Sequence, residues 1–309
     1  MSQLLRNLVR GIGRMSSYHT SVLLDESIDA LQVKSGERYI DATLGGGGHS
    51  LEIVQRGGIV LGLDIDEDAL DYVEKEVRSK NQEARERLTI AKGNFKNIDK
   101  LAKENGFDRV AGIVFDFGVS SHHFDEPSRG FSIQHDGPLD MRMDQDLGVK
   151  AADLLAVLPK GELYELFTKF GEERFAYAIA SSIVRARQVA RIETTKDLVV
   201  VINKVVRKRE EAMHAATRIF QALRIAVNDE LTSIEESLPK AVQLLQAKGR
   251  IAVISFHSLE DRIVKNAFKA FEEKGFGTIV TKKPLVPTDE EVARNTRSRS
   301  AKLRIFEKI

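Results

Sequence analysis

A glycine-rich turn and an acidic residue near the start of the sequence have the spacing of a site for an adenosine-containing ligand. The turn runs Asp41-Ala42-Thr43-Leu44-Gly45-Gly46-Gly47-Gly48-His49, and Asp64 follows Gly45 by 19 residues. Glycines at a strand-to-helix junction let a ligand touch backbone N–H groups. A carboxylate about 20 residues later suits the ribose hydroxyls. An adenosine-type ligand is expected, although a tight strand-to-helix connection alone would also favour such glycines.

The details of the turn favour S-adenosylmethionine (SAM) over a dinucleotide. A dinucleotide site calls for a third glycine at position 50, where the chain has Ser50, and the GK[ST] ending of a phosphate loop is absent. SAM has no phosphate and carries a cationic sulfonium, which suits Asp41 and the lack of an adjacent Lys or Arg. An NAD-dependent oxidoreductase remains a distant alternative.

Asp116 is the candidate catalytic residue because it ends an apolar run, 112–115, that is typical of a buried strand. At the carboxyl end of such a strand it would face the ligand crevice. If the group to be methylated is an amino group conjugated to a ring, it is a poor nucleophile, and an oxygen that holds its N–H would direct the lone pair toward a methyl group. Asp116 or a nearby backbone carbonyl could supply that oxygen. The alternative is that Asp116 caps a helix or anchors a loop.

Three further groups of polar residues are open to two interpretations. Asp140, Arg142 and Asp144 could order a long loop, which we prefer, or Arg142 could bind RNA phosphate. His257 and Glu260 could contact a flipped base or fix their own loop. His122, His123 and His135 lack the spacing of a metal site, so no metal is expected. The chain has no cysteine, which excludes thiolate chemistry.

The first third of the sequence alternates strand-like and helix-like segments, which is typical of an open parallel α/β sheet. Thr20 or Ser21 is expected to cap a first helix over 22–31. A short helix is expected to follow the glycine turn and end at Val54. The other expected elements are a charged helix over 66–78, a helix ending near Gly249, and strands over 38–43, 59–63, 88–91, 110–115, 250–256, 277–281 and 303–306.

The middle of the chain has a different character. Residues 121–145 predict a loop, and 150–225 have only helical periodicity, with Phe175, Ile179, Ile183 and Ala186 on one stripe. We therefore expect a sheet domain over 15–120 and 219–309, and an inserted loop and helical domain over 121–218. Residues 1–14 are expected to be a disordered extension, with Met15 a candidate true start; Arg6, Arg10 and Arg14 only weakly resemble a transit peptide.

Charge is unevenly distributed along a chain whose net charge is only +1. Residues 174–224 contain eleven Lys/Arg against four Asp/Glu, and residues 292–309 contain six against one. Such stretches suit phosphate contact on one face or form a solvated helix surface. No apolar run approaches the roughly 18 residues of a membrane span. We expect a cytoplasmic protein without a membrane partner, and leave a homodimer open.

Several long ordered segments resemble one family. They are HTSVLLDE from His19, GGGGHS from Gly45, FDFGVSS from Phe115, RGFSIQHDGPLDMRMD from Arg129, GEERFA from Gly171, ATRIFQALRIAVNDEL from Ala215, SFHSLEDRIVK from Ser255 and RSRSAKLR from Arg297. From about Tyr18 to the C-terminus the chain resembles the bacterial small-subunit ribosomal RNA cytosine-N4 methyltransferase family, known as RsmH or MraW. This resemblance implies a class I, Rossmann-like SAM-dependent methyltransferase that modifies a cytosine N4 in the decoding region of 16S rRNA.

The resemblance also implies which residues bind. It assigns SAM contacts to Gly45, Gly47, Gly48, His49, Asp64, Phe95, Asp116 and His123, where His123 replaces the Gln of many members. A second departure is MHAATR from Met213 in place of KHPATR. The inserted helices are implied to recognise rRNA within an assembled or assembling small subunit. Arg142, Arg218, Arg224, His257 and Glu260 are the candidate substrate contacts, with one of Arg218 and Arg224 expected at the domain junction. A ribosome-assembly factor without catalysis is the other functional class.

Overall fold

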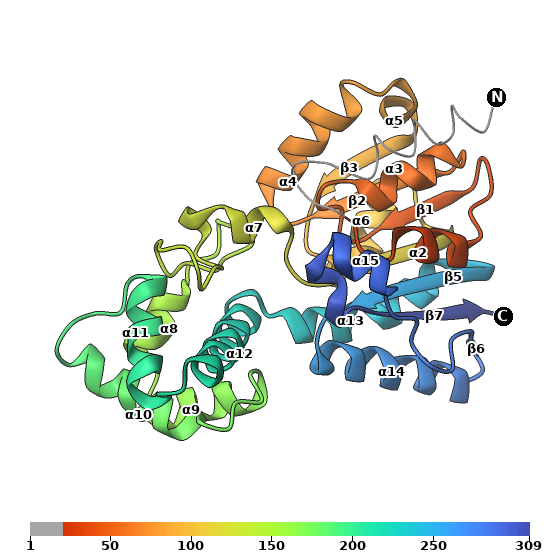
Figure 1. The fold of residues 1–309 in the computed structure, drawn as a ribbon. Helices are drawn as coiled ribbons and strands as arrows, with labels where there is room; N and C mark the ends of the chain where they lie inside the picture. Colours follow the sequence, from red (N-terminus) through yellow and green to blue (C-terminus); the bar gives the residue numbers. More distant parts are fainter. Residues whose placement is uncertain (1–20) are drawn as a thin grey trace. The chain divides into compact units, whose positions relative to one another are not determined.

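The computed structural model describes residues 21–309 and divides into two compact units (Figure 1). One unit comprises 21–120 with Leu231–Ile309, and the other is Ser121–Glu230. The second unit extends past the expected boundary at 218 because α12 is one continuous helix over Arg209–Asn228. The expectations for residues 1–14, Met15 and Thr20 lie outside the described residues.

The first unit is built on a seven-stranded sheet in the order β3-β2-β1-β4-β5-β7-β6. Strands β1 to β5 run parallel, whereas β7 is antiparallel to both of its neighbours. The order reverses between β1 and β4, and a ligand crevice forms at such a switch point. The strands are β1 (Arg38–Asp41), β2 (Ile59–Asp64), β3 (Leu88–Lys92), β4 (Val110–Asp116), β5 (Leu245–Ser255), β6 (Gly277–Ile279) and β7 (Lys302–Lys308).

Helices cover both faces of this sheet, as Figure 1 shows. Along β4, Ile113 and Phe115 join the hydrophobic core on one face and Val114 joins the core on the other, as expected for a parallel strand buried on both sides. One face packs on α2 (Leu24–Leu31), α3 (Gly48–Gln55), α4 (Glu67–Tyr72) with its π-helical continuation Val73–Arg78, and α5 (Gln82–Arg87). The other face packs on α6 (Ile98–Glu104), α13 (Glu230–Leu244) and α14 (Ser258–Glu273). A short helix, α15 (Asp289–Arg294), precedes β7.

Some expected boundaries were wrong. The first helix begins at Leu24, and its N-cap is Leu23 in the left-handed conformation, with φ 49° and no side-chain cap, so Ser21 does not cap it. Strand β1 ends at Asp41 because the chain turns toward the glycines there. The helix expected to end near Gly249 ends at Leu244, where β5 already begins. Local patterns could not reveal the start of α2 because the Leu23 amide donates to Glu291, a residue far away in the sequence.

The second unit is helical, as expected, and begins with the expected long loop. That loop contains short helical turns at α7 (Ser121–Asp125) and Pro127–Arg129. Ile179 and Ile183 of the expected stripe are buried. The main helices are α8 (Ala151–Val157), α9 (Lys160–Lys169), α10 (Ala176–Arg187), α11 (Thr195–Val205) and α12.

Within the described part of the chain, no helix combines the length and apolar character needed to cross a bilayer.

Candidate active site

Three neighbouring parallel strands each end in an aspartate. Asp41, Asp64 and Asp116 are the last residues of β1, β2 and β4, and these strands are adjacent in the sheet. Carboxyl ends of parallel strands meet at one edge, so the three carboxylates surround the switch point between β1 and β4. The result is a group of three carboxylates at one edge of the sheet, which suits a cationic ligand.

The glycine turn lies beside these carboxylates. Gly45 and Gly47 have φ of 49° and 78°, in the left-handed region that favours glycine. A Cβ on Gly48 would lie 2.0 Å from Ser21 Oγ, so any larger residue there would displace Ser21. The turn thus packs against Ser21, the first residue of the 21–23 segment.

Asp64 is tied to this turn by hydrogen bonds. Gly45 N donates to Asp64 Oδ2 at 2.8 Å, and Asp66 N donates to Asp64 Oδ1 at 2.9 Å. Burial raises the pKa of Asp64 to about 6, against the lowering effect of these two N–H groups. Each carboxylate oxygen keeps a second lone pair, so Asp64 can still accept hydroxyl groups.

Asp41 is fully buried at the base of the turn. Ser50 Oγ donates to Asp41 Oδ2 at 2.7 Å and Thr43 N donates to Asp41 Oδ1 at 3.3 Å. Burial raises the pKa of Asp41 to about 6. No Lys or Arg among the described residues forms an ion pair with Asp41 or Asp64, so none of these cations neutralises their charge.

A hydrogen bond from its backbone amide fixes the position of Asp116. Its amide donates to Thr43 Oγ1 at 2.6 Å, which joins the end of β4 to the turn after β1. Burial raises the pKa of Asp116 well above its ordinary value, and the nearby charges of Asp41 and Glu260 raise it further. A carboxylate with a raised pKa is a strong acceptor of hydrogen bonds and protons, which suits it to orient an amino group.

His49 lies between the turn and Asp116. Its Nδ1 is 3.9 Å from Asp116 Oδ2, and a hydrogen bond joins the ring to the Val22 backbone. Burial lowers the pKa of His49 to about 4, so the ring is neutral near pH 7. His49 Nε2 is buried and has no hydrogen-bond partner among the described residues. An unsatisfied buried nitrogen beside the crevice suits a polar group of a ligand.

Phe95 follows β3 and belongs to an aromatic cluster. Its ring centroid lies 5.9 Å from that of Phe115 and 5.6 Å from that of Phe117. Because Phe95 is only partly buried, one part of its ring remains available to an adenine.

His257 and Glu260 form a capping box at the start of α14. Glu260 Oε2 accepts from Phe256 N at 2.7 Å and from His257 N at 3.2 Å, and His257 Nδ1 accepts from Glu260 N. These contacts favour the loop-fixing interpretation of the pair. Base contact by His257 stays a prediction.

The candidate substrate arginines lie in the second unit, and all three have protein partners. Arg142 binds Asp140 with Nε at 2.7 Å and donates to the carbonyls of Gln145 and Leu147, which favours the loop-ordering role. Arg218 pairs with the buried Glu173 at 2.7 Å, and Arg224 pairs with Glu230 at 2.9 Å. RNA contact by any of them stays a prediction.

His123, the remaining cofactor candidate, also belongs to the second unit. It is buried on α7, where its ring packs edge-on against Phe131 at 4.9 Å. A SAM contact by His123 stays a prediction.

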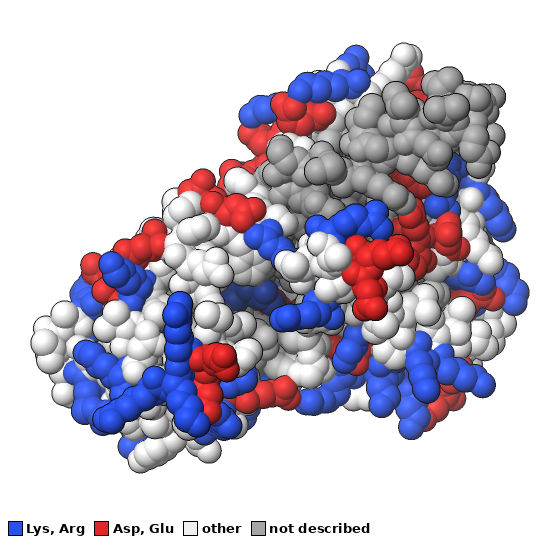
Figure 2. Space-filling view, viewed as in Figure 1, with Lys and Arg blue, Asp and Glu red and all other residues white. Residues whose placement is uncertain are grey.

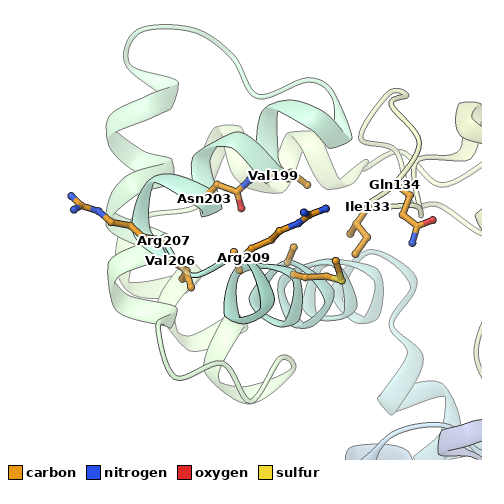
Figure 3. A pocket seen from close by; sticks show the side chains of 10 residues that line it. Ile133, Gln134, Val199, Asn203, Val206, Arg207 and Arg209 are labelled. Atoms are coloured by element: carbon orange, nitrogen blue, oxygen red, sulfur yellow. The ribbon is translucent and has the colours of Figure 1, made fainter.

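The second unit contains a cavity of about 390 Å³ between α11, α12 and the 133–134 loop (Figure 3). Arg209 extends into it from α12, whereas Arg207 points outward (Figure 3). Neither arginine forms an ion pair with a described residue, although Arg174, Arg218 and Arg224 of the same unit do. The other lining residues are Ile133, Gln134, Val199, Asn203, Val206, Ala212, Met213 and Ala216.

Figure 2 shows Lys and Arg gathered on the visible face over α9 and α10.

Sequence reasoning missed three contributors to the site. Ser50 was interpreted only as a missing glycine, yet its hydroxyl supports Asp41. Thr43 holds the Asp116 amide, and a hydroxyl residue just after a strand is too common a feature to predict that contact. Glu291 lies 268 residues from Leu23, its partner, so no local pattern could connect them.

Three carboxylates at the switch point, a glycine turn beside them and the unsatisfied nitrogen of His49 fit SAM, whose sulfonium is positive and which has no phosphate. The strand order with a reversed β7 and this site define a Rossmann-like SAM-dependent methyltransferase, which confirms the predicted fold class and cofactor.

The chain belongs to the MraW methylase family, whose model matches residues 16–309. It is 46% identical over 312 residues to the "Ribosomal RNA small subunit methyltransferase H" of Carboxydothermus hydrogenoformans, covering 96% of this chain and 99% of the relative. It is 47% identical to the protein of the same name from Citrifermentans bemidjiense, covering 94% and 99%.

Solved structures with similar folds include a putative rRNA-methylase from Clostridium thermocellum, at 17% identity and a TM-score of 0.43, covering 94% of this chain and 98% of that one. A putative methyltransferase from Streptococcus mutans in complex with SAH has 13% identity and a TM-score of 0.44, covering 94% and 99%.

Proposed function

We propose that this protein transfers the methyl group of SAM to the N4 amino group of a cytosine in the decoding region of small-subunit rRNA. The placement of Asp116, whose pKa is raised, at the end of β4 beside the glycine turn is the observation that carries this proposal. The relatives named as rRNA small subunit methyltransferases support an rRNA substrate. We expect the RNA to be presented in the cytoplasm, within an assembled or assembling small subunit.

In the proposed complex, the backbone of Gly45, Gly47 and Gly48 and the ring of His49 lie against the cofactor. Asp64 accepts the ribose hydroxyls, and Phe95 packs on the adenine. When bound, SAM supplies an electrophilic methyl group on a positive sulfur. Asp41 and Asp116 add negative charge around the sulfonium, whose stabilisation is strongest in a site shielded from water.

Asp116 is the proposed catalytic residue. Its carboxylate accepts a hydrogen bond from the cytosine amino group, which turns the nitrogen lone pair toward the methyl group for in-line attack. The raised pKa of Asp116 favours this acceptor role. Alignment and exclusion of water are the main contributions of the protein, and the proton released from nitrogen can pass to water after transfer.

The cavity of the second unit is the proposed contact for an unpaired nucleotide of the RNA. Val199, Ile133 and Met213 offer apolar surface to a base, and the amides of Gln134 and Asn203 suit base edges. Arg207 and Arg209 can receive phosphate because no described carboxylate engages them. Basic and apolar groups together are typical of single-strand recognition.

Mass spectrometry of nucleosides tests the proposed reaction. Purified protein and SAM are incubated with small subunits from cells that lack this modification, and the RNA is digested. New N4-methylcytidine is expected with the wild type and with Asp108→Ala, an exposed aspartate that serves as a matched control. Asp116→Ala is expected to form none.

The outcomes also separate the alternatives. SAM binding without methylcytidine on any form of the subunit would contradict the cytosine-N4 assignment. An Asp116→Ala protein that still supports subunit maturation in cells would favour the assembly-factor alternative. The oxidoreductase alternative predicts protection against heating by NAD, which we do not expect.

A further inference from the structure

Glu291 makes a contact across almost the whole chain. From α15, its Oε1 accepts a hydrogen bond from Leu23 N at 2.8 Å, and 268 residues separate the two. Thr288 caps the start of α15 by accepting from Glu291 N at 3.2 Å. The carboxylate therefore reaches Leu23 from an anchored helix.

Leu23 requires an external partner. It is fully buried, it is the N-cap of α2, and its left-handed φ of 49° costs about 1 kcal/mol or more for a residue other than glycine. No side chain of its own segment caps α2. An N-cap amide buried without an acceptor would be destabilising, and Glu291 supplies the acceptor.

Residues 21–23, which end at Leu23, pack directly against the glycine turn. Ser21 Oγ occupies the space that a Cβ on Gly48 would need, at 2.0 Å. The Val22 backbone hydrogen-bonds the ring of His49. Both the closeness of the turn and the orientation of His49 thus depend on where residues 21–23 lie.

We propose that Glu291 is a positioning residue for cofactor binding, which acts through Leu23 to hold residues 21–23 against the glycine turn. This inference rests on the proposed placement of SAM at that turn. The effect of Glu291 on the turn is transmitted by the backbone of Val22 and by Ser21, and its charge also raises the pKa of Asp116. Loss of the contact lets the segment move away from Gly48 and frees the His49 ring.

The test compares Glu291→Ala with Glu291→Gln, which keeps an oxygen acceptor, and with Glu290→Ala, an exposed neighbour on the same helix. SAM affinity is measured by calorimetry. We expect Kd to rise about tenfold in Glu291→Ala, consistent with loss of a hydrogen bond to a charged group. We expect changes within about twofold in Glu291→Gln and Glu290→Ala.

Kinetic and exchange measurements distinguish positioning from a general loss of stability. With RNA as substrate, Glu291→Ala is expected to raise KM for SAM while leaving KM for RNA unchanged. Hydrogen exchange at the Leu23 amide is expected to accelerate in Glu291→Ala and to be restored in Glu291→Gln. If Glu291→Ala does not fold, Glu291→Asp, whose side chain is one methylene shorter, replaces it in the same comparison.

Two results overturn the inference: SAM binding unchanged in folded Glu291→Ala, or equal weakening in Glu291→Gln and Glu291→Ala. An Asp64→Ala variant reports separately on the placement of SAM. If Asp64→Ala also leaves SAM binding intact, the proposed cofactor site is wrong. If only Asp64→Ala weakens binding, the site stands and the role of Glu291 falls.

Discussion

His49 Nδ1 and Asp116 Oδ2 lie 3.9 Å apart, yet the two groups do not form an ion pair near neutral pH. Burial lowers the pKa of His49 to about 4, and burial with the charges of Asp41 and Glu260 raises the pKa of Asp116. Both shifts favour the neutral form of each group. A buried site that disfavours charge in its free state is prepared to receive a cation, which would stabilise the Asp116 carboxylate.

Asp116→Asn is expected to remove methyl transfer and yet stabilise the fold at pH 8. Because the pKa of Asp116 is raised in the folded state, the folded protein binds more protons, and stability falls as pH rises from about 4 through the folded pKa. Asparagine mimics the protonated acid. Urea unfolding should show a higher free energy of unfolding than the wild type at pH 8, and almost no difference at pH 3.5. A loss of stability at pH 8 would contradict this account.

SAM binding is expected to weaken in mild acid more than binding of the product, S-adenosylhomocysteine, which lacks the sulfonium charge. The pKa values of Asp41 and Asp64 are about 6, so both lose negative charge between pH 7.5 and 5.5. The ratio of the two Kd values should rise about three- to tenfold over this range by calorimetry. Asp41→Asn should reduce that change. A constant ratio would show that the carboxylates do not act on the sulfonium.

Gly48→Ala is expected to weaken SAM binding about tenfold because its Cβ would displace Ser21 from the turn. Combining it with Ser21→Gly should recover part of the loss, since the clashing hydroxyl is then absent. Kd for SAM is the measurement, and Ser21→Gly alone serves as the control. Additive losses in the double variant would mean that the contact between residues 21 and 48 is not the cause.

Thr43→Val is expected to lower kcat about tenfold with little change in Kd for SAM. The substitution keeps the shape but leaves the Asp116 amide without its acceptor at 2.6 Å, so the end of β4 loses its attachment to the turn. Thr43→Ser keeps the hydroxyl and should retain activity. Single-turnover kinetics on small subunits measures the effect; equal rates for the valine and serine variants would rule it out.

Arg209→Ala is expected to weaken RNA binding and to lower the slope of log K against log salt by about 1, as for one lost phosphate contact. Arg209 extends into the cavity without an ion-pair partner among the described residues. Arg185→Ala, on exposed α10 surface that does not line the cavity, is the control of equal charge. An equal change in both variants would indicate that Arg209 acts only through the overall positive charge of the second unit and not through a specific phosphate contact.

The sequence determined by itself the alternation of strands and helices, the glycine turn, and the positions of Asp64 and Asp116 at strand ends. Periodicity and strand-end positions depend on near neighbours in the chain, and parallel strands bring their carboxyl ends to one edge. The resemblance in ordered motifs also determined the family, because it depends on residue identity rather than on spatial contacts.

Only the tertiary structure decided how these groups are held and charged. The start of α2 was wrongly predicted because Leu23 is satisfied by Glu291, a partner at the other end of the chain. The support of Asp116 by Thr43 and the raised pKa values of the aspartates likewise arise from burial and contacts between strands. These contacts and pKa shifts depend on distances in space, which separation along the sequence does not reveal.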